Sequence, residues 1–353
     1  MLISIFCEVI DNFGDIGVCY RLAKNLIKNN IQVNLYINDL HCLAKIIPLN
    51  IIEFDVNLKC QKLDNIQIIH WQNDVNDTIE YDNADKIINA FACKLPSIYQ
   101  QTMPKNIVWI QLDYLALGKW AKEYHGLYAY IHQHKRYFFT PSFYPNTGGL
   151  LTNDFHLIQD NDKQSLMHKY NIQKINTNIH IFIFAYINQN LLDSLVILQQ
   201  FSHVKIFMPI SVYVNLPKPV QINITPLDFC SQNDFDNLLQ VFDILWVRGE
   251  DSFIRAQLAN KPLIWQAYIQ EEDNEHFNKV NCFLDLYLSY FKPYNQIIKN
   301  LWQSINGIIP IRQAYFIDYL AIFNQKEFVN GLEEWNKYLN HLPKLEDEIM
   351  NFN

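Results

Sequence analysis

The stretch ILWVRGEDSFIRAQLANKPLIWQAY, residues 244–268, contains the pattern that decides the fold. The apolar run 244–247 is typical of a buried strand, and a polar turn at 248–252 follows it. A helical pattern spans 251–260, and a second apolar run spans 262–268. A strand, a helix and a strand in this order predict two parallel strands joined by a helix.

The same alternation continues on both sides of this stretch. Helical patterns occur at 16–29, 191–201 and 233–243, and from about 274 onward. Apolar runs that predict further strands lie at 2–10, 31–37, 66–71, 86–92, 106–112, 135–141, 180–186 and 204–210. Strands that alternate with helices predict parallel sheets covered by helices on both faces.

The runs form two sets, and the polar stretch QDNDKQ at 159–164 separates them. A chain of 353 residues also favours two domains at roughly 150 residues each. We therefore predict an α/β protein with Rossmann-like domains at 1–155 and 165–320, facing each other across a cleft. The helices at 321–353 either close the second domain or cross back to the first. Ligands of open parallel sheets bind at the carboxyl ends of the strands.

The composition excludes several classes of protein. Half of the residues are hydrophobic and 14% are aromatic, which predicts large cores rather than disorder. A net charge of −8 argues against a general nucleic-acid binder. No apolar run reaches the roughly 18 residues of a membrane span, and the N-terminus predicts a strand rather than a signal peptide. Seven cysteines without CxxC spacing favour reduced thiols and a cytoplasmic location over disulfides or zinc.

The turn DNFGDIG at 11–17 follows the first predicted strand and precedes the first helix. Asp11 and Asp15 flank Gly14, so one carboxylate could act as a general base while the other orients it. In the alternative, Asp15 caps the helix and Asp11 satisfies amides of the turn. The residues leave both interpretations open. The turn lacks the GxGxxG fingerprint, so a nicotinamide cofactor has little support.

The turn Arg248-Gly249-Glu250-Asp251-Ser252 also joins a strand to a helix. Amides at a helix N-terminus and the helix dipole favour a bound diphosphate, and Arg248 and Ser252 add donors. Glu250 and Asp251 would then bind sugar hydroxyls or a developing cation. The alternative is a capped helix without a ligand.

Other polar and aromatic residues carry weaker signals. The double glycine 148–149 predicts a turn between domains. Phe229 and Tyr186 lie at strand ends and are predicted to stack on a ligand. The following histidines lack metal spacing and are predicted to be packed or solvated: His125, His132, His134 and His276. The following aromatic residues are predicted to lie in the core: Trp109, Tyr114, Trp265 and Tyr268.

Several long motifs together resemble the elongation factor P arginine rhamnosyltransferases, the EarP family. The two most specific are IFC-x-VIDNFGDIGVC-x-RLA at 5–23 and VRGEDSF-x-RAQ-x-A-x-KP-x-x-W at 247–265. The segments WIQLDYL at 109–115 and TPSFYPNTGGLL at 140–151 are similar to the family as well. The resemblance spans roughly residues 1–290.

The resemblance implies a GT-B fold with an acceptor-side first domain and a nucleotide-sugar second domain. It implies transfer of rhamnose from dTDP-β-L-rhamnose to an arginine of elongation factor P, with inversion and without a metal or cofactor. The modified factor rescues ribosomes stalled at consecutive prolines. Direct binding of nucleic acid or membrane is not expected.

The family's functional residues carry over to matching positions of this chain. Asp11, Asp15 and Glu250 match the essential carboxylates, with Asp15 as the general base. The matching substrate-binding residues are Asn12, Phe13, Gly14, Tyr186, Phe229, Gln232, Arg248, Asp251 and Ser252. Two departures loosen the nucleotide assignments: Phe-Cys-Ser-Gln at 229–232 replaces Phe-x-Pro-Gln, and Tyr-Ile-Asn at 186–188 replaces Tyr-Glu-Asn.

Two alternatives remain. The chain could be a non-catalytic module that binds elongation factor P, although the three carboxylates together argue against this. It could also be a GT-B enzyme that uses another sugar nucleotide, such as a UDP-sugar.

Overall fold

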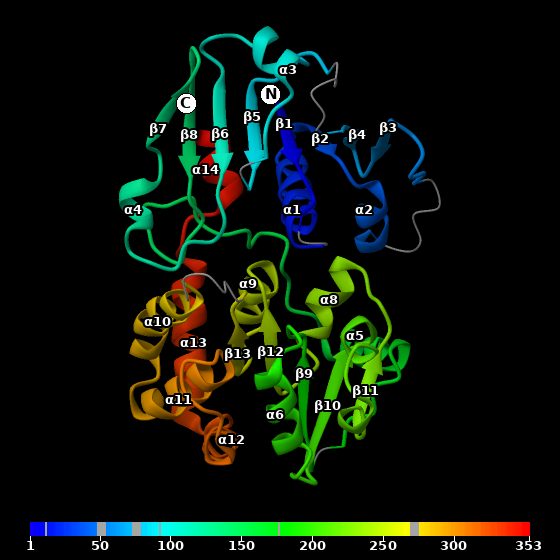
Figure 1. The fold of residues 1–353 in the computed structure, drawn as a ribbon, viewed down its shortest axis with the longest axis vertical. Helices are drawn as coiled ribbons and strands as arrows, with labels where there is room; N and C mark the ends of the chain where they lie inside the picture. The colour runs from blue at the N-terminus through cyan, green and yellow to red at the C-terminus, as the bar shows by residue number, and fades with distance from the viewer. Residues whose placement is uncertain (11–12, 48–53, 73–78, 92, 176, 269–274) are drawn as a thin grey trace. The chain divides into compact units, whose positions relative to one another are not determined.

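The structure is a computed structural model that describes residues 1–10, 13–47, 54–72, 79–91, 93–175, 177–268 and 275–353. The chain divides into two compact units (Figure 1). The first comprises Met1–Asp154 and Leu342–Asn353, and the second comprises Phe155–His341. Each unit has its own β-sheet covered by helices.

The first unit contains an eight-stranded sheet in the order β3-β4-β2-β1-β5-β6-β8-β7. All neighbours pair in parallel except β3 with β4 and β7 with β8. Its strands are β1 (Leu2–Cys7), β2 (Gln32–Ile37), β3 (Cys60–Leu63), β4 (Ile66–His70), β5 (Lys86–Ala90), β6 (Val108–Leu112), β7 (Tyr128–Ile131) and β8 (His134–Phe139). Its helices are α1 (Gly14–Lys28), α2 (Leu40–Ile46), α3 (Ser97–Thr102), α4 (Ala121–Tyr124) and α14 (Leu345–Asn351).

The C-terminal helix α14 is fixed to the first unit by a buried lysine. Lys86 of β5 donates from Nζ to the carbonyl oxygens of Ile349 at 3.0 Å and Met350 at 2.8 Å. A cation at these last carbonyls completes their hydrogen bonding and complements the helix dipole. Ile349 itself is fully buried in the same apolar core as β1 and α1.

The second unit contains a five-stranded sheet in the order β11-β10-β9-β12-β13, with every neighbouring pair parallel. Its strands are β9 (Ile179–Ile183), β10 (Val204–Pro209), β11 (Ile224–Leu227), β12 (Ile244–Arg248) and β13 (Leu263–Gln266). Its helices are α5 (Asp160–Lys169), α6 (Gln189–Leu198), α7 (Ile210–Tyr213), α8 (Gln232–Leu238), α9 (Asp251–Leu258), α10 (Glu275–Tyr287), α11 (Asn295–Ile305), α12 (Gln313–Ile322) and α13 (Lys326–Asn340).

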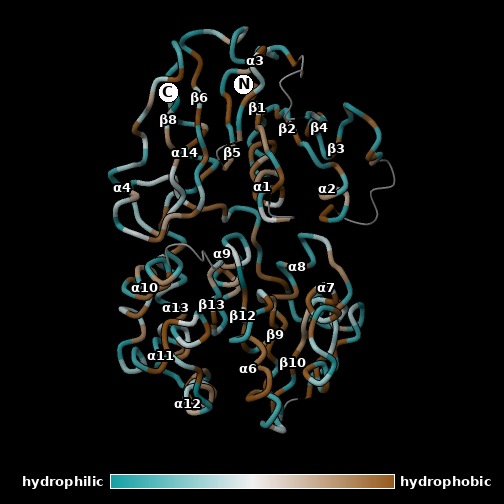
Figure 2. The backbone as a smooth tube through the Cα atoms, viewed as in Figure 1, coloured by the Kyte–Doolittle hydropathy of each residue, from teal (hydrophilic) through white to brown (hydrophobic). Residues whose placement is uncertain are grey.

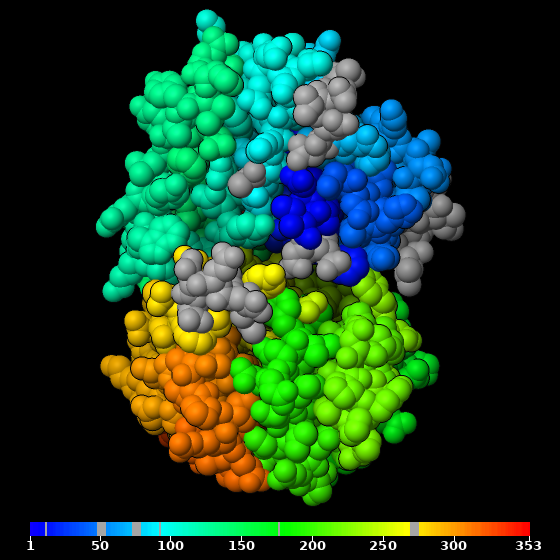
Figure 3. Space-filling model, in the orientation of Figure 1, coloured from blue at the N-terminus to red at the C-terminus, as the bar shows by residue number. Residues whose placement is uncertain are grey.

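Hydrophobic residues colour much of β9 and β10 brown in Figure 2, as expected for strands covered on both faces. The C-terminal helices of this unit pack through aromatic rings: Phe283 of α10 stacks on Trp302 of α11 at 5.8 Å and meets the edge of Trp335 of α13. The outer residues of α11 and α12 form the orange surface of the second unit in Figure 3. None of the helices in the described part of the chain is long and apolar enough to cross a membrane.

The prediction of parallel α/β sheets with helices on both faces is confirmed. Most predicted strands are present within two or three residues of their expected ends. Several short elements had no clear signal: α2, α3, α4, β3, β7 and β11. The polar stretch at 159–164 lies inside the second unit, where it forms the beginning of α5.

Candidate active site

The carboxyl ends of the second unit's strands lie at one edge of its sheet, because all five strands are parallel. Tyr186 follows β9, Phe229 follows β11, Arg248 ends β12 and Tyr268 follows β13. Four chain segments therefore bring candidate ligand-binding residues to the same edge. This is the edge at which open parallel sheets bind ligands.

The turn between β12 and α9 depends on Gly249. Its φ of +66° lies in the left-handed region that favours glycine. Trp265 of β13 donates from Nε1 to the Gly249 carbonyl oxygen at 2.8 Å, and Trp265 is itself buried by stacking on Phe253. The turn is therefore held from a neighbouring strand.

Arg248 lies between aromatic rings. The guanidinium carbon is 4.5 Å from the ring centroids of both Phe184 and Tyr186, and Nη1 contacts the Ala185 carbonyl oxygen at 3.5 Å. Stacking of this kind orients the planar guanidinium and leaves its donors in fixed directions. Such an arginine is suited to bind the two oxygens of a phosphate.

Tyr186 is itself held in place by Gln266 of β13. The Tyr186 amide donates to Gln266 Oε1 at 2.6 Å, and Gln266 Nε2 donates to the Tyr186 carbonyl oxygen at 3.2 Å. Tyr268 meets the Tyr186 ring edge-on with centroids 5.4 Å apart. The strand β13 thus supports both the tyrosine and, through Trp265, the glycine of the neighbouring turn.

The N-terminus of α9 carries the remaining candidate residues of this turn. Glu250 is the N-cap residue of α9, but within the described chain its side chain makes no capping hydrogen bond. The alternative that the Glu250 side chain caps the helix is therefore wrong. Asp251 and Ser252 occupy the first turn and are half-buried. Backbone amides at this position can bind an anion.

Phe229 and Gln232 belong to the connection between β11 and α8. The Phe229 side chain is 43% exposed at the carboxyl edge, as a stacking residue requires, and Gln232 is the first residue of α8. Ser231 caps this helix by accepting a hydrogen bond from the Asp234 amide at 3.3 Å. Burial and the charges of Asp234 and Asp236 raise the pKa of Cys230 to about 12, so its thiol stays protonated at neutral pH.

In the first unit, Asp15 lies in the first turn of α1 and is only 3% exposed. Its Oδ2 accepts from the Ile10 amide at 3.1 Å, and its Oδ1 accepts from the Tyr114 hydroxyl at 3.5 Å. Phe13, rather than Asp15, is the N-cap residue, so the capping alternative for Asp15 is wrong. A buried carboxylate with two donors is fixed in one orientation, which a general base needs.

Tyr114 was not expected at this place. It was predicted to lie in the core, as was Tyr268, but these residues are 47% and 59% exposed. Tyr114 stacks on Phe91 at 4.7 Å, which supports its ring while its hydroxyl reaches Asp15. Their positions just after β6 and β13, at carboxyl ends, are the signal that could have identified them. The core prediction is confirmed for Trp109 and Trp265.

The structure thus brings Asp15 together with Tyr114 in one unit, where Phe13 is the N-cap residue of the same helix, and Arg248 together with Tyr186 and Tyr268 in the other. Asp11 and Asn12 lie outside the described residues. Gly14 is the first residue of α1. Among the residues that the structure describes, no group of three or more His, Cys, Asp or Glu side chains could hold a metal ion.

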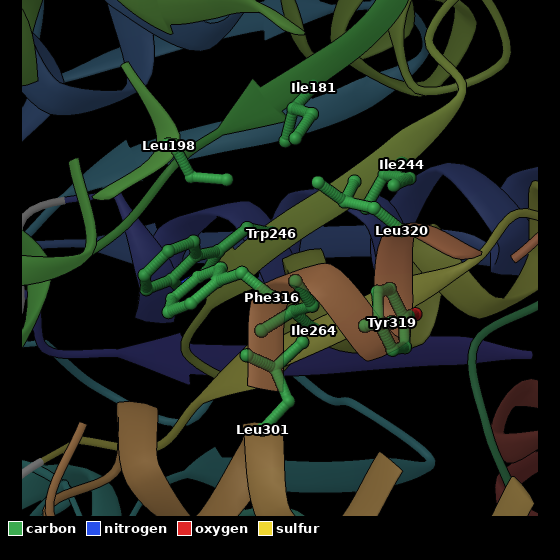
Figure 4. A pocket seen from close by; sticks show the side chains of 9 residues that line it. All are labelled: Ile181, Leu198, Ile244, Trp246, Ile264, Leu301, Phe316, Tyr319 and Leu320. Atoms are coloured by element: carbon green, nitrogen blue, oxygen red, sulfur yellow. The ribbon is translucent and has the colours of Figure 1, made fainter. Parts of the chain in front are cut away.

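A cavity in the second unit lies apart from this edge. Sheet residues face α6, α11 and α12 around it, as Figure 4 shows. None of the candidate site residues lines this cavity. Its apolar lining consists of Ile181, Leu198, Ile244, Trp246, Ile264, Leu301, Phe316, Tyr319 and Leu320. The cavity therefore belongs to the core and not to the ligand-binding edge.

Two Rossmann-like α/β sheets in one chain are the architecture of GT-B glycosyltransferases. A solved structure described as "Structural basis for EarP-mediated arginine glycosylation of translation elongation factor EF-P" has the same fold. It aligns with a TM-score of 0.64 and 21% identity over 99% of this chain and 98% of that one. A glycosyltransferase of kitacinnamycin aligns with a TM-score of 0.55 and 9% identity over 99% and 98%.

The family model "Elongation-Factor P (EF-P) rhamnosyltransferase EarP" matches residues 3–353, and this chain belongs to that family. A protein-arginine rhamnosyltransferase of Pseudomonas putida is 31% identical over 88% of each chain. Another from Neisseria meningitidis serogroup B is 26% identical over 99% of this chain and 96% of its own. The resemblance found in the sequence motifs is therefore confirmed over the whole chain.

Proposed function

We propose that this chain transfers L-rhamnose from dTDP-β-L-rhamnose to an arginine of elongation factor P, with inversion of the anomeric centre. Family membership over residues 3–353 carries this proposal. The modified factor would then relieve ribosomes stalled at consecutive prolines. An acceptor of this kind, together with seven free cysteines, favours a cytoplasmic location.

The second unit is the proposed donor-binding unit. Phe229 stacks on the thymine and Gln232 contacts its edge, while Arg248, Ser252 and the α9 amides bind the diphosphate. The rings beside Arg248 already fix its guanidinium, so little side-chain entropy is lost on binding. Tyr186 and Asp251 contact the donor, and Glu250 orients the sugar.

The first unit is the proposed acceptor-binding unit, with Asn12, Phe13 and Gly14 contacting the substrate. An arginine guanidinium is protonated at neutral pH and has no lone pair free to attack. One carboxylate, assigned to Asp11, holds and polarises the guanidinium, while Asp15 removes a proton from the attacking nitrogen. The Tyr114 hydroxyl and the Ile10 amide keep the Asp15 carboxylate in place.

As the nitrogen–carbon bond forms, the bond between the anomeric carbon and the diphosphate oxygen breaks. The leaving dTDP gains negative charge, which Arg248 and the α9 amides stabilise in the role that a metal ion has in other transferases. Attack from the side opposite the diphosphate gives inversion. The step needs no metal and no cofactor.

Incubation of the chain with elongation factor P and dTDP-β-L-rhamnose, followed by intact-mass measurement, tests the proposal directly. We expect the acceptor mass to increase by one deoxyhexose, and the increase to disappear when the acceptor arginine is changed to lysine. An unmodified acceptor, despite binding between the two proteins, would instead support the non-catalytic module. Tighter binding of UDP than of dTDP would support the other sugar nucleotides.

A further inference from the structure

Three neighbouring strands of the first unit end side by side. The strands β1, β5 and β6 are parallel, and β5 lies between the other two (Figure 1). Asp15 lies in the helix that follows β1, Phe91 follows β5 directly, and Tyr114 is the second residue after β6. Because the Tyr114 hydroxyl lies 3.5 Å from Asp15 Oδ1, the Tyr114 side chain extends past the end of β5 toward the end of β1. The Phe91 ring stacks against it, with centroids 4.7 Å apart and 21° between the planes.

Phe91 has a strained backbone conformation. Its φ of +55° lies in the left-handed region, which a bulky side chain rarely adopts because of clashes with its own backbone. The Phe91 amide donates to the Leu112 carbonyl oxygen at 2.8 Å, and the Phe91 side chain is buried. Strained residues persist only where their surroundings hold them, and they concentrate at ligand sites. This outlier therefore indicates a functional need for a ring at the end of β5.

The backbone on both sides of Tyr114 is also held. The Asp113 amide donates to the Phe139 carbonyl oxygen at 2.9 Å, and the Ala116 amide donates to the Pro141 carbonyl oxygen at 2.8 Å. Both bonds join the segment after β6 to the end of β8 and the residues that follow it. The Tyr114 side chain nevertheless remains 47% exposed. A supported, exposed ring beside a buried carboxylate is a preformed surface for a ligand.

An arginine side chain matches both features of this surface. Its guanidinium is planar, cationic and weakly hydrated, so it stacks on aromatic faces and pairs with carboxylates. The Tyr114 ring supplies the face, and Asp15 supplies the carboxylate. A lysine ammonium is a compact and strongly hydrated charge, and it gains less from an aromatic face. The arrangement therefore favours a guanidinium over other cationic groups.

We propose that the guanidinium of the acceptor arginine stacks on the Tyr114 ring, which Phe91 supports, beside the Asp15 carboxylate. This role rests on the proposed function, because it describes how the acceptor side of that site recognises its substrate. Tyr114 is a substrate-binding residue, whereas Phe91 touches no substrate and is a positioning residue. A guanidinium held flat against the ring presents its nitrogen in one direction, so Asp15 can remove the proton as that nitrogen attacks.

Calorimetry of the chain with elongation factor P separates this role from a purely structural one. Tyr114→Leu removes the ring and should raise the Kd of the acceptor about five- to 30-fold, as expected for loss of a partly desolvated contact between a cation and a ring. For a form of elongation factor P whose acceptor arginine is replaced by methionine, the same change should raise the Kd less than about twofold, because no such contact is lost.

Two further variants and a control sharpen the measurement. Tyr114→Phe keeps the ring and should leave the Kd of the arginine acceptor within about twofold. Phe91→Leu removes only the support and should raise this Kd about two- to fivefold. Tyr130→Leu is the matched control, because Tyr130 is an exposed tyrosine of the same unit, on the edge strand β7. Urea denaturation of each variant checks that it is folded before its Kd is compared.

Three outcomes would overturn this role of Tyr114. They are an unchanged Kd of the arginine acceptor in Tyr114→Leu, an equal weakening of the arginine and methionine acceptors, and a loss in Tyr114→Phe as large as that in Tyr114→Leu. The binding measurements need no turnover. If the intact-mass measurement shows no transfer of rhamnose, that result contradicts the proposed transfer alone, and the comparison of the two acceptors still tests whether Tyr114 binds the guanidinium.

Discussion

The turn that opens α1 and the turn that opens α9 occupy the same place between a strand and a helix, but they present side chains of opposite charge. Both follow a buried parallel strand and precede an amphipathic helix. The α1 turn presents the buried carboxylate of Asp15, held by a backbone amide and a tyrosine. The α9 turn presents the guanidinium of Arg248, held by two aromatic rings. The fold puts both turns at the carboxyl end of a parallel strand, and the side chains determine whether a turn is suited to a cationic or an anionic ligand.

In the proposed mechanism, the two turns therefore have different parts of the reaction. A carboxylate is suited to remove a proton from a cationic acceptor, whereas a guanidinium beside helix amides is suited to an anionic leaving group. Changes in the α1 turn should therefore affect turnover, and changes in the α9 turn should affect donor binding as well.

Asp15→Asn should abolish transfer, a loss of about 1,000-fold or more, because the amide cannot accept the proton. The Kd for dTDP should stay unchanged, since no donor contact is assigned to Asp15. Intact-mass kinetics on elongation factor P and calorimetry with dTDP measure the two quantities. Tyr114→Phe, which removes only one donor to the carboxylate, is the control and should cost far less. If Asp15→Asn turns over as fast as the unaltered chain, Asp15 is not the general base.

Arg248→Lys should weaken dTDP binding about 10- to 30-fold, although the positive charge is kept. The ammonium lacks the planar fork and cannot stack between Phe184 and Tyr186 in the same way. Unlike Asp15→Asn, this change should raise Kd and lower kcat together. Lys205→Arg on β10, an exposed cation within the strand, is the control. An unchanged Kd would show that the α9 turn does not bind the diphosphate.

Phe229→Leu should weaken dTDP binding about five- to tenfold, because stacking on a base contributes about 1–3 kcal/mol. The effect on turnover at saturating donor should be small, since the ring lies on the nucleotide side of the proposed donor. Equilibrium binding with dTDP and UDP measures it. Phe201→Leu is the control, because Phe201 is a half-buried phenylalanine of the same unit, beside the amino end of β10. If Phe229→Leu and the unaltered chain bind dTDP with equal affinity, the thymine does not stack on Phe229.

Substitution of Asp82, which lies in the first unit away from the α1 turn, has the smallest expected effect. Burial alone would raise the pKa of Asp82, but hydrogen bonds from Ser4, Tyr99, Asn34 and Tyr36 outweigh it and lower the pKa. Its folded pKa lies below the unfolded value of about 3.9, so its contribution is present above that pH and is lost as pH falls through the folded pKa.

Asp82→Asn should therefore lower the free energy of unfolding by about 1 kcal/mol at neutral pH and leave dTDP binding unchanged. The difference from the unaltered chain should shrink as pH falls below about 4, within the range where both remain folded. Urea denaturation at several pH values measures it. A difference that stays constant down to the lowest pH would contradict the role of the Asp82 charge.

Most of the parallel sheets could be predicted from the sequence, because a strand buried on both faces is a short apolar run whatever its partners are. The short elements could not. Residues 128–131 alternate between exposed and half-buried positions, and β11 contains Pro226, which is tolerated because the strand lies at the sheet's edge. Elements that short are stabilised by their neighbours rather than by their own residues.

The candidate site also contains residues that could be predicted from the sequence and residues that could not. Arg248, Glu250 and Asp15 could be proposed as site residues because they lie in polar turns directly after apolar strands. Tyr114 and Tyr268 were missed because an aromatic residue next to a strand has the same composition whether it faces the core or the edge. The exposure of each ring depends on which strands its own strand pairs with.

The fold class, the family and the positions of the two turns could be predicted from residues that are close together in the chain. The contacts that hold those turns are seen in the folded structure alone. The contacts of Trp265 with Gly249 and of Gln266 with Tyr186 join residues that are distant in sequence. Such contacts form only after strands from different parts of the chain have paired, and a local sequence pattern does not specify that pairing.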